Sequence, residues 1–422
     1  GLWITLSNGH KYLNGSGGAA VASLGYRHPA MVAAVCDPKD LQVGDELLYP
    51  SGDSLGFADD LVATTGGKMY AASLYNSGSD AVEAAIKLAV QTQNSRGQGH
   101  RSVFIARENS YHGATGGALN VSGHLNRRNG NHALLRMDVE FVSPCNTYRD
   151  MVPGETEEQY VDRLAQELEG VFAARLGEVV AMIAEPVVGA ALGCMGAPKG
   201  YLKRMQQICH KHGALFIVDE VMCGSGRSGK TFHVWQQEED FVPDIQTLGK
   251  GLTGGYEAVG VIMATREVHD LVRNTDGEVR HGQTFQCFPR ACRAGRAAIR
   301  EILPRLSHVE EMGKLLKAGL KANLASHRYV GDIRGSGLFV AIELVMDKMT
   351  KVPFHRNRTI IERLKNKALG PDYQVRVYHS TGCADGNHGD AIMLAPPYII
   401  TEEEVQWIVQ RITSVVNDFF DE

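Results

Sequence analysis

A run of small polar residues at positions 75–80, YNSGSD, precedes an alanine-rich helical pattern that begins at Ala81. Backbone amides without partners, together with the helix dipole, favour a phosphate group at such a helix N-terminus. Ordinary capping of the helix by Ser79 or Asp80 explains the same residues equally well. The run therefore indicates either an anion site or a simple helix cap.

A carboxylate ends the apolar segment ALFIVDE at 214–220, which places Asp219 at the end of a predicted strand. Open α/β sheets bind their ligands at this end. There Asp219 could hold a pyridine nitrogen in its protonated form through a short ion pair that raises the pKa of the nitrogen. The alternative is a structural aspartate that caps a loop.

Lys250 stands between two glycines in the segment DIQTLGKGLTGG, directly after another short run. A lysine fixed in close-packed backbone is partly desolvated, which lowers its pKa toward that of a nucleophilic amine able to form a Schiff base. Most lysines are instead solvated surface charges. Taken together, the phosphate-binding run, Asp219 and Lys250 form the set of groups that pyridoxal 5'-phosphate (PLP) requires.

The segment GSGRSGKT, from Gly224 to Thr231, matches every fixed position of the G-x-x-x-x-G-K-[ST] motif of P-loops. A P-loop follows an apolar strand directly and opens a helix. Here Asp219 and Glu220 precede the loop, and the residues after it have a poor helical pattern with Pro243 close behind. A P-loop NTPase is therefore a remote alternative, which nucleotide binding in the presence of magnesium would test.

The histidines and a short arginine pair suggest no further chemistry. None of the 16 histidines belongs to an H-E-x-x-H motif or to a Cys/His cluster at zinc spacing, so no metal site is expected. His112, His281 and His388 are interpreted as turn or structural histidines rather than metal ligands. Arg127 and Arg128 form too short a basic patch to bind nucleic acid and are expected to face solvent.

The overall composition is that of an ordinary folded protein. Of 422 residues, 44% are hydrophobic and 22% charged, and the net charge of -5 argues against nucleic acid or an anionic membrane as a partner. The eight cysteines form no C-x-x-C pair and are interpreted as reduced thiols. Neither a membrane span nor a secretory signal is in view, so we expect a cytoplasmic protein; because residue 1 is Gly, a mitochondrial location stays open.

Apolar segments alternate with helical patterns through the middle of the chain, which predicts an α/β fold. The predicted buried parallel strands are SVFIA (102–106), VVAMIAE (179–185), ALFIVDE (214–220) and AVGVIMA (258–264). Helices are predicted over 81–90 and 200–212, the second closed by Gly213, and a final helix is expected to open at Thr401. We predict a large domain over 41–300 and a smaller α+β domain formed by 1–40 and 301–422.

Motifs spread over nearly the whole chain resemble the class III, or omega, aminotransferases, which are PLP-dependent enzymes of fold type I. In order, they are SLGYRHPAMVAAV, NSGSDAVEAAIKLA, SYHGATGGAL, AEPVVGAALGC, KGYLKRMQQICHKHGALFIVDEV, GSGRSGK, PDIQTLGKGLTGGY, HGQTFQCFPRACRAG, DIRGSGLF and LAPPYIITEEEVQWIV. The resemblance implies a large domain with a mainly parallel, seven-stranded sheet and a homodimer with shared active sites. It also gives the P-loop match a structural explanation, since GSGRSGK resembles the family's stretch after the strand-end aspartate.

The resemblance implies roles for the residues that bind the cofactor. Lys250 would form the Schiff base and then act as general base, and Asp219 would pair with the pyridine nitrogen. The phosphate would contact Ser77, Gly78 and Ser79, with a further contact from Thr284 of the neighbouring subunit.

Other implied contacts surround the cofactor ring. Tyr111 would stack on one face of the ring and Val221 would pack against the other. His112 is counted with the cofactor-binding residues, and Glu185 would lie near the phenolic oxygen as the third catalytic residue.

The implied reaction moves an amino group from an amine or amino acid donor to a keto acid or aldehyde acceptor with ping-pong kinetics. Decarboxylases, an aminomutase and lyases of the same fold use the same lysine and aspartate, and they remain alternatives. A catalytically inert binding protein is less favoured because the cofactor set is complete.

The sequence departs from the family before the LAPPY motif. Many members that act on α-amino acids carry an arginine there, which binds a carboxylate through its bidentate fork. In this chain Arg376 lies well upstream, followed by the insert TGCADGNHG. Arg376 is therefore only a candidate for carboxylate recognition, and the insert with Asp385 and His388 is expected to be a longer turn rather than part of the entrance.

Overall fold

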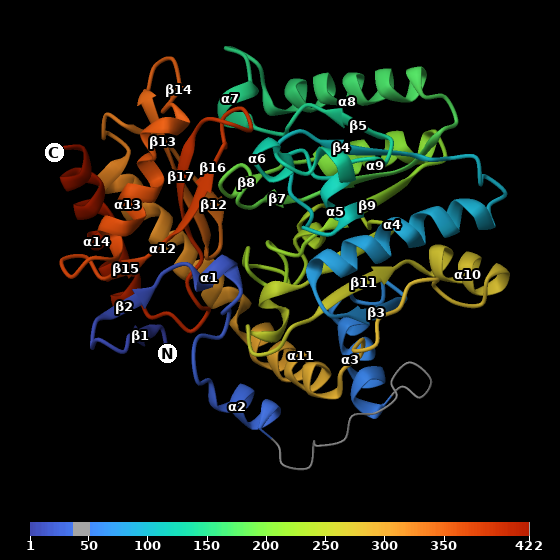
Figure 1. Ribbon diagram of the computed structural model, residues 1–422, viewed down its shortest axis with the longest axis horizontal. Helices are drawn as coiled ribbons and strands as arrows, with labels where there is room; N and C mark the ends of the chain where they lie inside the picture. The colour runs from blue at the N-terminus through green and yellow to red at the C-terminus, as the bar shows by residue number, and fades with distance from the viewer. Residues whose placement is uncertain (37–50, 422) are drawn as a thin grey trace.

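A seven-stranded sheet forms the centre of the larger part of the molecule (Figure 1). The computed structural model describes residues 1–36 and 51–421. In spatial order the strands are β3 (Ala71–Tyr75), β11 (Gly260–Ala264), β10 (Ile245–Leu248), β9 (Leu215–Asp219), β6 (Val179–Ala184), β4 (Val103–Arg107) and β5 (Val139–Val142). The five strands from β10 to β5 are mutually parallel. The predicted α/β fold with a mainly parallel sheet is confirmed.

One of the predicted parallel strands has the opposite direction. The segment AVGVIMA forms β11, which pairs antiparallel with both β10 and β3. Between Leu248 and Gly260 the chain forms a single 3-10 turn, η4 (Lys250–Thr253), and reverses at Gly254 and Gly255, whose φ angles are +67° and +86°. Parallel pairing requires a crossover, usually an α-helix, and this connection contains none.

Helices cover both faces of the large sheet, because the side chains on both faces of its central strands are apolar. Phe104 and Ala106 of β4 pack in the same cluster as α4 (Gly78–Ser95) and α10 (Arg266–Thr275). Ile105, one residue away, packs in the cluster that contains α8 (Glu157–Ala174) and α9 (Tyr201–Lys211). The same second cluster includes α3 (Gly52–Thr64) and α11 (Pro289–Ile302). The predicted helices over 81–90 and 200–212 are α4 and α9, and Gly213, with φ of +74°, ends α9 as expected.

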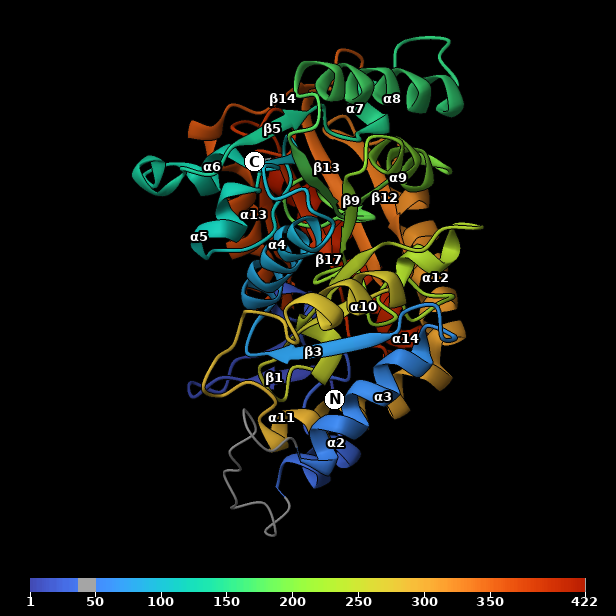
Figure 2. The same ribbon diagram turned by 90° about the vertical axis from the view of Figure 1, so that its right-hand side faces the viewer.

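A second sheet lies beside the first and is antiparallel. Its strands are β12 (Val330–Ser336), β13 (Phe339–Asp347), β17 (Asp390–Leu394) and β16 (Tyr378–Thr381), with β14 (Val352–Pro353) on β13. The helices of this part are α12 (Leu306–Leu324), α13 (Ile360–Leu369) and α14 (Glu402–Phe420), and Thr401 caps α14 as predicted. In the view from the right, α10 and β3 lie in front of this second sheet (Figure 2).

The N-terminal strands lie next to the C-terminal part of the chain (Figure 1). β1 (Trp3–Thr5) pairs with β2 (Lys11–Asn14), and β2 pairs with β15 (Val375–Arg376) in a three-stranded sheet. The remaining short elements are α1 (Gly17–Ala20), α2 (Pro29–Val35), α5 (Gly116–Asn120), α6 (Leu125–Arg128), α7 (Thr147–Asp150), β7 (Val187–Val188) and β8 (Met195–Gly196). None of the helices within the described ranges is both long and apolar enough to cross a membrane.

The segment Gly224–Thr231 lies at the contact between the two main sheets and does not have P-loop geometry. It forms consecutive turns, and the next helical element is the short 3-10 helix η3 (Val234–Gln237). The buried Arg227 guanidinium donates hydrogen bonds to Leu338 O at 3.2 Å and Pro396 O at 2.6 Å. This segment therefore joins the large sheet to residues beside the second sheet.

Candidate active site

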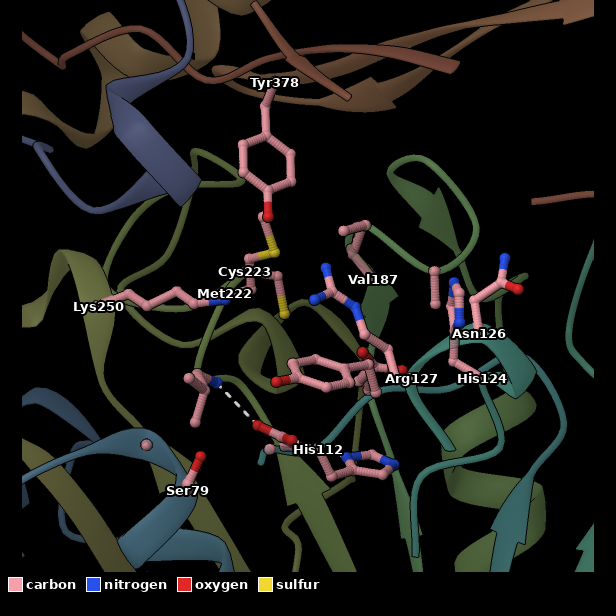
Figure 3. Close-up of a pocket in the computed structure, with 18 of the residues that line it drawn as sticks. Ser79, His112, His124, Asn126, Arg127, Val187, Met222, Cys223, Lys250 and Tyr378 are labelled. Carbon is pink, nitrogen blue, oxygen red and sulfur yellow. Dashed lines mark hydrogen bonds and ion pairs between the residues drawn. The ribbon is translucent and has the colours of Figure 1, made fainter. Parts of the chain in front are cut away.

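A cavity of about 420 Å³ opens at the carboxyl ends of β6 and β9 and is closed on the opposite side by β16 (Figure 3). All the residues predicted to contact the cofactor line it except Thr284, namely Ser77, Gly78, Ser79, Tyr111, His112, Glu185, Asp219, Val221 and Lys250. The structure thus brings together residues that are far apart in the sequence. This position agrees with the rule that open α/β sheets bind ligands at the carboxyl ends of their strands.

The first turn of α4 forms one wall of the cavity. Ser77, rather than Ser79 or Asp80, caps the helix: its Oγ accepts a hydrogen bond from the Asp80 amide at 3.2 Å. Ser79 Oγ accepts from the Ala114 amide at 3.0 Å. Within the described residues, the amides of Gly78 and Ser79 have no acceptor. These free donors at the positive end of the helix dipole suit an anion such as phosphate.

Gly78 is required at its position by close packing. A β-carbon placed on Gly78 would lie 2.5 Å from Val221 Cγ1, which is well inside van der Waals contact. Because Gly78 has no side chain, the start of α4 can approach the residues that follow β9. The start of α4 and the segment after β9 therefore meet at Gly78 and Val221 in the wall of the cavity.

Asp219 is the last residue of β9 and is almost fully buried. Its Oδ1 accepts hydrogen bonds from the Val221 amide and the Thr247 hydroxyl, both at 2.9 Å. Its Oδ2 lies 2.7 Å from Nδ1 of the buried His112. The parallel register of β9 and β10 places Thr247 directly opposite Asp219. The carboxylate is thus held from three sides at the edge of the cavity.

Lys250 begins η4, two residues after β10 ends, and its φ of +46° lies in the left-handed region. Its side chain extends into the cavity toward Met222 and Cys223 (Figure 3). In residues 1–36 and 51–421, no group forms a hydrogen bond or ion pair with its amine. Burial lowers the pKa of Lys250, and the nearby carboxyl groups of Asp219 and Glu185 oppose that shift. The amine is therefore closer to its nucleophilic, neutral form than a solvated lysine is.

Glu185 follows β6 and presents a buried carboxyl group to the cavity. Burial raises its pKa to about 7, against the opposing effects of His112 and Arg107. The Arg107 guanidinium donates to the Glu185 backbone carbonyl at 2.6 Å and lies 3.8 Å from Oε2 of the same residue. A carboxyl group with this pKa can gain or lose a proton near neutral pH.

Arg127 and Arg128, which were expected to face solvent, make different contacts. Arg127, on α6, is exposed in the single chain, but its guanidinium turns into the cavity and lies 5.4 Å from the centroid of the Tyr111 ring (Figure 3). Arg128 is half-buried and donates hydrogen bonds to the carbonyl groups of Asn120 and Ser122. The prediction is wrong for Arg128, because α5 ends with carbonyl groups that need donors.

Two other predicted residues, Thr284 and Arg376, lie outside the cavity. Thr284 is exposed, in the segment between α10 and α11. Its neighbour Gln283 accepts a hydrogen bond from the Asn76 amide at 3.2 Å, which places the segment beside the start of α4. Arg376 does not line the cavity, since it is exposed on β15, where it pairs with Asn14 of β2.

The insert forms the turn between β16 and β17, as expected. Asp385 accepts hydrogen bonds from the amides of Asn387 and His388 and lies 2.9 Å from the His388 ring, so the turn is closed by its own residues. Neither Asp385 nor His388 lines the cavity. In the described part of the chain, no group of three or more His, Cys, Asp and Glu side chains could hold a metal ion.

Several residues that line the cavity carried no signal in the sequence. They are His124, Asn126, Val187, Met222, Cys223, Tyr378, His379 and Thr381. Tyr378, His379 and Thr381 come from β16, so the second sheet supplies the wall opposite the large sheet. Tyr378 and His379 are adjacent, so the three residues do not follow the alternation of a strand with one buried face, and no pattern in the sequence indicates that they reach the cavity.

Comparisons with known proteins agree with the cavity's composition. A model of the class III aminotransferase family matches residues 1–416. An aminotransferase of Gibberella zeae is 38% identical over 423 residues, which cover 98% of this chain and 82% of that protein. Gamma aminobutyrate transaminase 3, chloroplastic, of Solanum lycopersicum is 31% identical, and the match covers 99% of this chain and 79% of that protein. The crystal structure of the omega transaminase from Pseudomonas jessenii in complex with PMP has a TM-score of 0.90 and 28% identity, covering 100% of this chain and 91% of that one.

Proposed function

The chain belongs to the class III aminotransferase family, and from this membership we propose how its own residues carry out amino-group transfer. The protein is a PLP-dependent transaminase of fold type I that moves an amino group from a donor to a keto acceptor. When bound, PLP supplies an aldehyde that exchanges amino groups and a ring that accepts electrons from the substrate.

The observation that carries the proposal is the convergence of three groups in one cavity. They are the unpartnered amides at the start of α4, the carboxylate at the end of β9 and the amine that follows β10. These groups match the phosphate, the pyridine nitrogen and the aldehyde of PLP. We assign the phosphate to Ser77, Gly78 and Ser79, the nitrogen to Asp219, and a Schiff base with the aldehyde to Lys250.

Lys250 is also proposed as the general base. When its amine is not bonded to the cofactor, Lys250 would remove a proton from the α-carbon of the donor and return it later. Burial lowers the pKa of this amine, so a larger fraction is neutral and able to accept the proton. Lys250 would thus both hold the cofactor and move the proton at one carbon atom.

Val221, Tyr111 and Glu185 are proposed to surround the ring. Val221 follows the Asp219 carboxylate and packs against Gly78, which supports a position on one face of the ring. Tyr111 supplies an aromatic surface from the other side of the cavity. The Glu185 carboxyl, with its pKa raised to about 7 by burial, suits a position near the phenolic oxygen, where a proton can be shared. His112 would act through Asp219, which it contacts directly.

We propose that the active protein is a homodimer in which Thr284 contacts the phosphate of the partner's site. Two observations support this arrangement. Thr284 is exposed, and the adjacent Phe285 has 60% of its surface exposed, which is unusual for a phenylalanine. The hydrogen bond between Asn76 and Gln283 places the same segment beside the start of α4 of its own chain, so a contact within one subunit is the alternative to be tested.

A hybrid dimer tests this sharing directly. Lys250→Ala and Thr284→Ala subunits are mixed, refolded together and separated by tags. If Thr284 acts across the dimer, one site of the hybrid regains both groups and recovers the PLP affinity of the wild type. If Thr284 acts within its own subunit, or if the protein is a monomer, the hybrid gains nothing over the Thr284→Ala homodimer.

The division of the chain into a large domain, 41–300, and a smaller domain, 1–40 with 301–422, is part of the proposal, and the boundary between 40 and 41 lies outside the described residues. It is supported by the pairing of β2 with β15 and by the separate sheets over 71–264 and 330–394. The cavity would then lie between the two domains, which is a common place for a substrate site.

Absorption spectra of the purified protein test the proposed chemistry. We expect a yellow band that bleaches when an amine donor is added and returns when a keto acid is added, and no such cycle in Lys250→Ala. Release of carbon dioxide or ammonia without transfer of nitrogen would favour the decarboxylase or lyase alternative. Absence of any band after addition of PLP would overturn the assignment of Lys250.

A further inference from the structure

Arg127 is the only arginine among the described residues that line the cavity. No carboxylate forms an ion pair with it, and no group in residues 1–36 or 51–421 accepts a hydrogen bond from its side chain. The neighbouring arginines differ in this respect, since Arg107 donates to Glu185 O and Arg128 donates to carbonyl groups at the end of α5. A guanidinium without an anionic partner therefore faces the site where the amino group is exchanged.

The N–H groups of Arg127 have no acceptor among the described residues. Its guanidinium carbon lies 5.4 Å from the centroid of the Tyr111 ring, a distance typical of a cation–π contact. Such a contact does not consume the N–H donors of the guanidinium. Figure 3 shows this group directed into the middle of the cavity, between Val187 and the end of Lys250. A carboxylate could accept two parallel hydrogen bonds there.

The short helix α6 that carries Arg127 is held in place by the second sheet. His124 Nε2 lies 3.0 Å from Thr381 O, and Asn126 Oδ1 accepts a hydrogen bond from Arg356 at 2.8 Å. A β-carbon on Gly386 in the turn between β16 and β17 would lie 3.0 Å from the Leu125 side chain, so this turn packs directly on α6. The insert therefore supports the cavity wall, although its residues Asp385 and His388 lie outside the cavity.

We infer that Arg127 binds a carboxylate of the substrate and that substrates with a carboxylate are preferred over amines of the same length that lack one. This inference rests on the proposed function and assigns its substrate class. It replaces Arg376, which lies outside the cavity, as the carboxylate-recognising residue.

The test measures the first half-reaction of the PLP-loaded enzyme with matched donors. Bleaching of the cofactor band is followed by stopped flow with 4-aminobutyrate and n-butylamine, and with 5-aminopentanoate and n-pentylamine. The variants are Arg127→Gln, Arg127→Lys and, as a matched control outside the cavity, Arg376→Gln. We expect Arg127→Gln to lower kcat/KM by about 10- to 100-fold for the carboxylate donors, mostly through KM, because hydrogen bonds to charged groups have this strength.

The matched amines should react at nearly unchanged rates in Arg127→Gln, and Arg127→Lys should recover part of the loss. A binding measurement adds a readout independent of turnover: pentanoate should bind the wild-type holoenzyme and Arg376→Gln by calorimetry, and Arg127→Gln at least tenfold more weakly. The absorption band and the affinity for PLP should be the same in all variants.

Three outcomes would overturn the inference. The first is a wild-type enzyme that reacts equally well with matched amines, or better. The second is an equal loss for both donor classes in Arg127→Gln, which would indicate a structural role. The third is a selective loss in Arg376→Gln. Failure of the wild type to bind PLP or to bleach with any donor would instead contradict the proposed function, and the spectra distinguish these cases.

Discussion

His112 Nδ1 lies 2.7 Å from Asp219 Oδ2, and both side chains are almost completely enclosed by protein. The other oxygen of the carboxylate accepts hydrogen bonds from the Val221 amide and the Thr247 hydroxyl. Asp219 is therefore fixed in one orientation before any ligand arrives. The geometry of the site depends on a contact between residues that are 107 positions apart.

Replacing His112 should impair catalysis through the position of Asp219. We expect His112→Phe to lower kcat by about 10- to 100-fold, the effect of a small misplacement of a catalytic group. His112→Gln, whose amide can still donate to the carboxylate, should recover part of the activity. The pH titration of the bound-PLP absorption band should shift in His112→Phe, and an unchanged titration would argue for a purely structural role.

Adding one methyl group at Gly78 should weaken cofactor binding. In Gly78→Ala the new β-carbon would lie 2.5 Å from Val221 Cγ1, so α4 and the segment after β9 must separate. Overpacking of this kind costs about 1–3 kcal/mol, which corresponds to a rise of about 5- to 150-fold in the Kd for PLP. Gly116→Ala is the matched control, since a β-carbon there has no neighbour within 4 Å. Equal Kd values for the two variants by fluorescence titration would contradict the prediction.

The stability of the cofactor-free protein should depend on Glu185 and pH. Burial raises the pKa of this carboxyl from 4.5 to about 7, so the folded protein binds the proton more tightly than the unfolded chain. The free energy of unfolding should therefore fall as pH rises from about 4.5 to about 7, by at most about 1.4 kcal/mol per unit of pKa difference. Urea unfolding at pH 5 and pH 8 should show a smaller difference in Glu185→Gln than in the wild type. A pH dependence that is the same in both proteins would show that Glu185 is not the group responsible.

Arg227 should be important for stability rather than for nucleotide binding. Arg227→Ala leaves the buried carbonyl groups of Leu338 and Pro396 without their donor. Loss of these hydrogen bonds should lower the free energy of unfolding by about 2–5 kcal/mol. Thermal unfolding checks this value, and addition of ATP with magnesium should leave the Tm of the wild type unchanged. A nucleotide-dependent increase in Tm would revive the P-loop alternative for Gly224–Thr231.

The sequence was sufficient to locate elements whose signals are local. Apolar runs with glycine or proline boundaries placed β4, β6 and β9 to within a residue or two, and Asp219 was correctly placed at a strand end. Nine of the 21 residues that line the cavity were named from the sequence, because they belong to motifs that are continuous in the chain. The direction of β11 was wrong, since both directions have the same apolar pattern and only the connection from β10 decides between them.

Contacts between distant segments could not be predicted. The interaction of His112 with Asp219 and the entry of Tyr378 into the cavity depend on how two sheets pack, and no short-range pattern encodes that. Arg127 was expected to be a surface residue, and its exposure agrees with that, but its direction depends on the contacts of α6 with the turn after β16. Arg376 was only a candidate because it lies well upstream of the LAPPY motif, and pairing with β2 holds it away from the cavity.

Because β16 forms one wall of the cavity, the substrate range of such an enzyme can change separately from its cofactor binding. The residues proposed to hold PLP lie on β9, at the start of α4 and in the segments that connect elements of the large sheet, whereas Tyr378, His379 and Thr381 lie on the second sheet. Mutations in β16 or in its turn can therefore reshape the space open to a substrate without disturbing the groups that anchor the cofactor. Selection for a new amine substrate can act on β16 and its turn, while the residues that bind PLP are preserved in other segments of the chain.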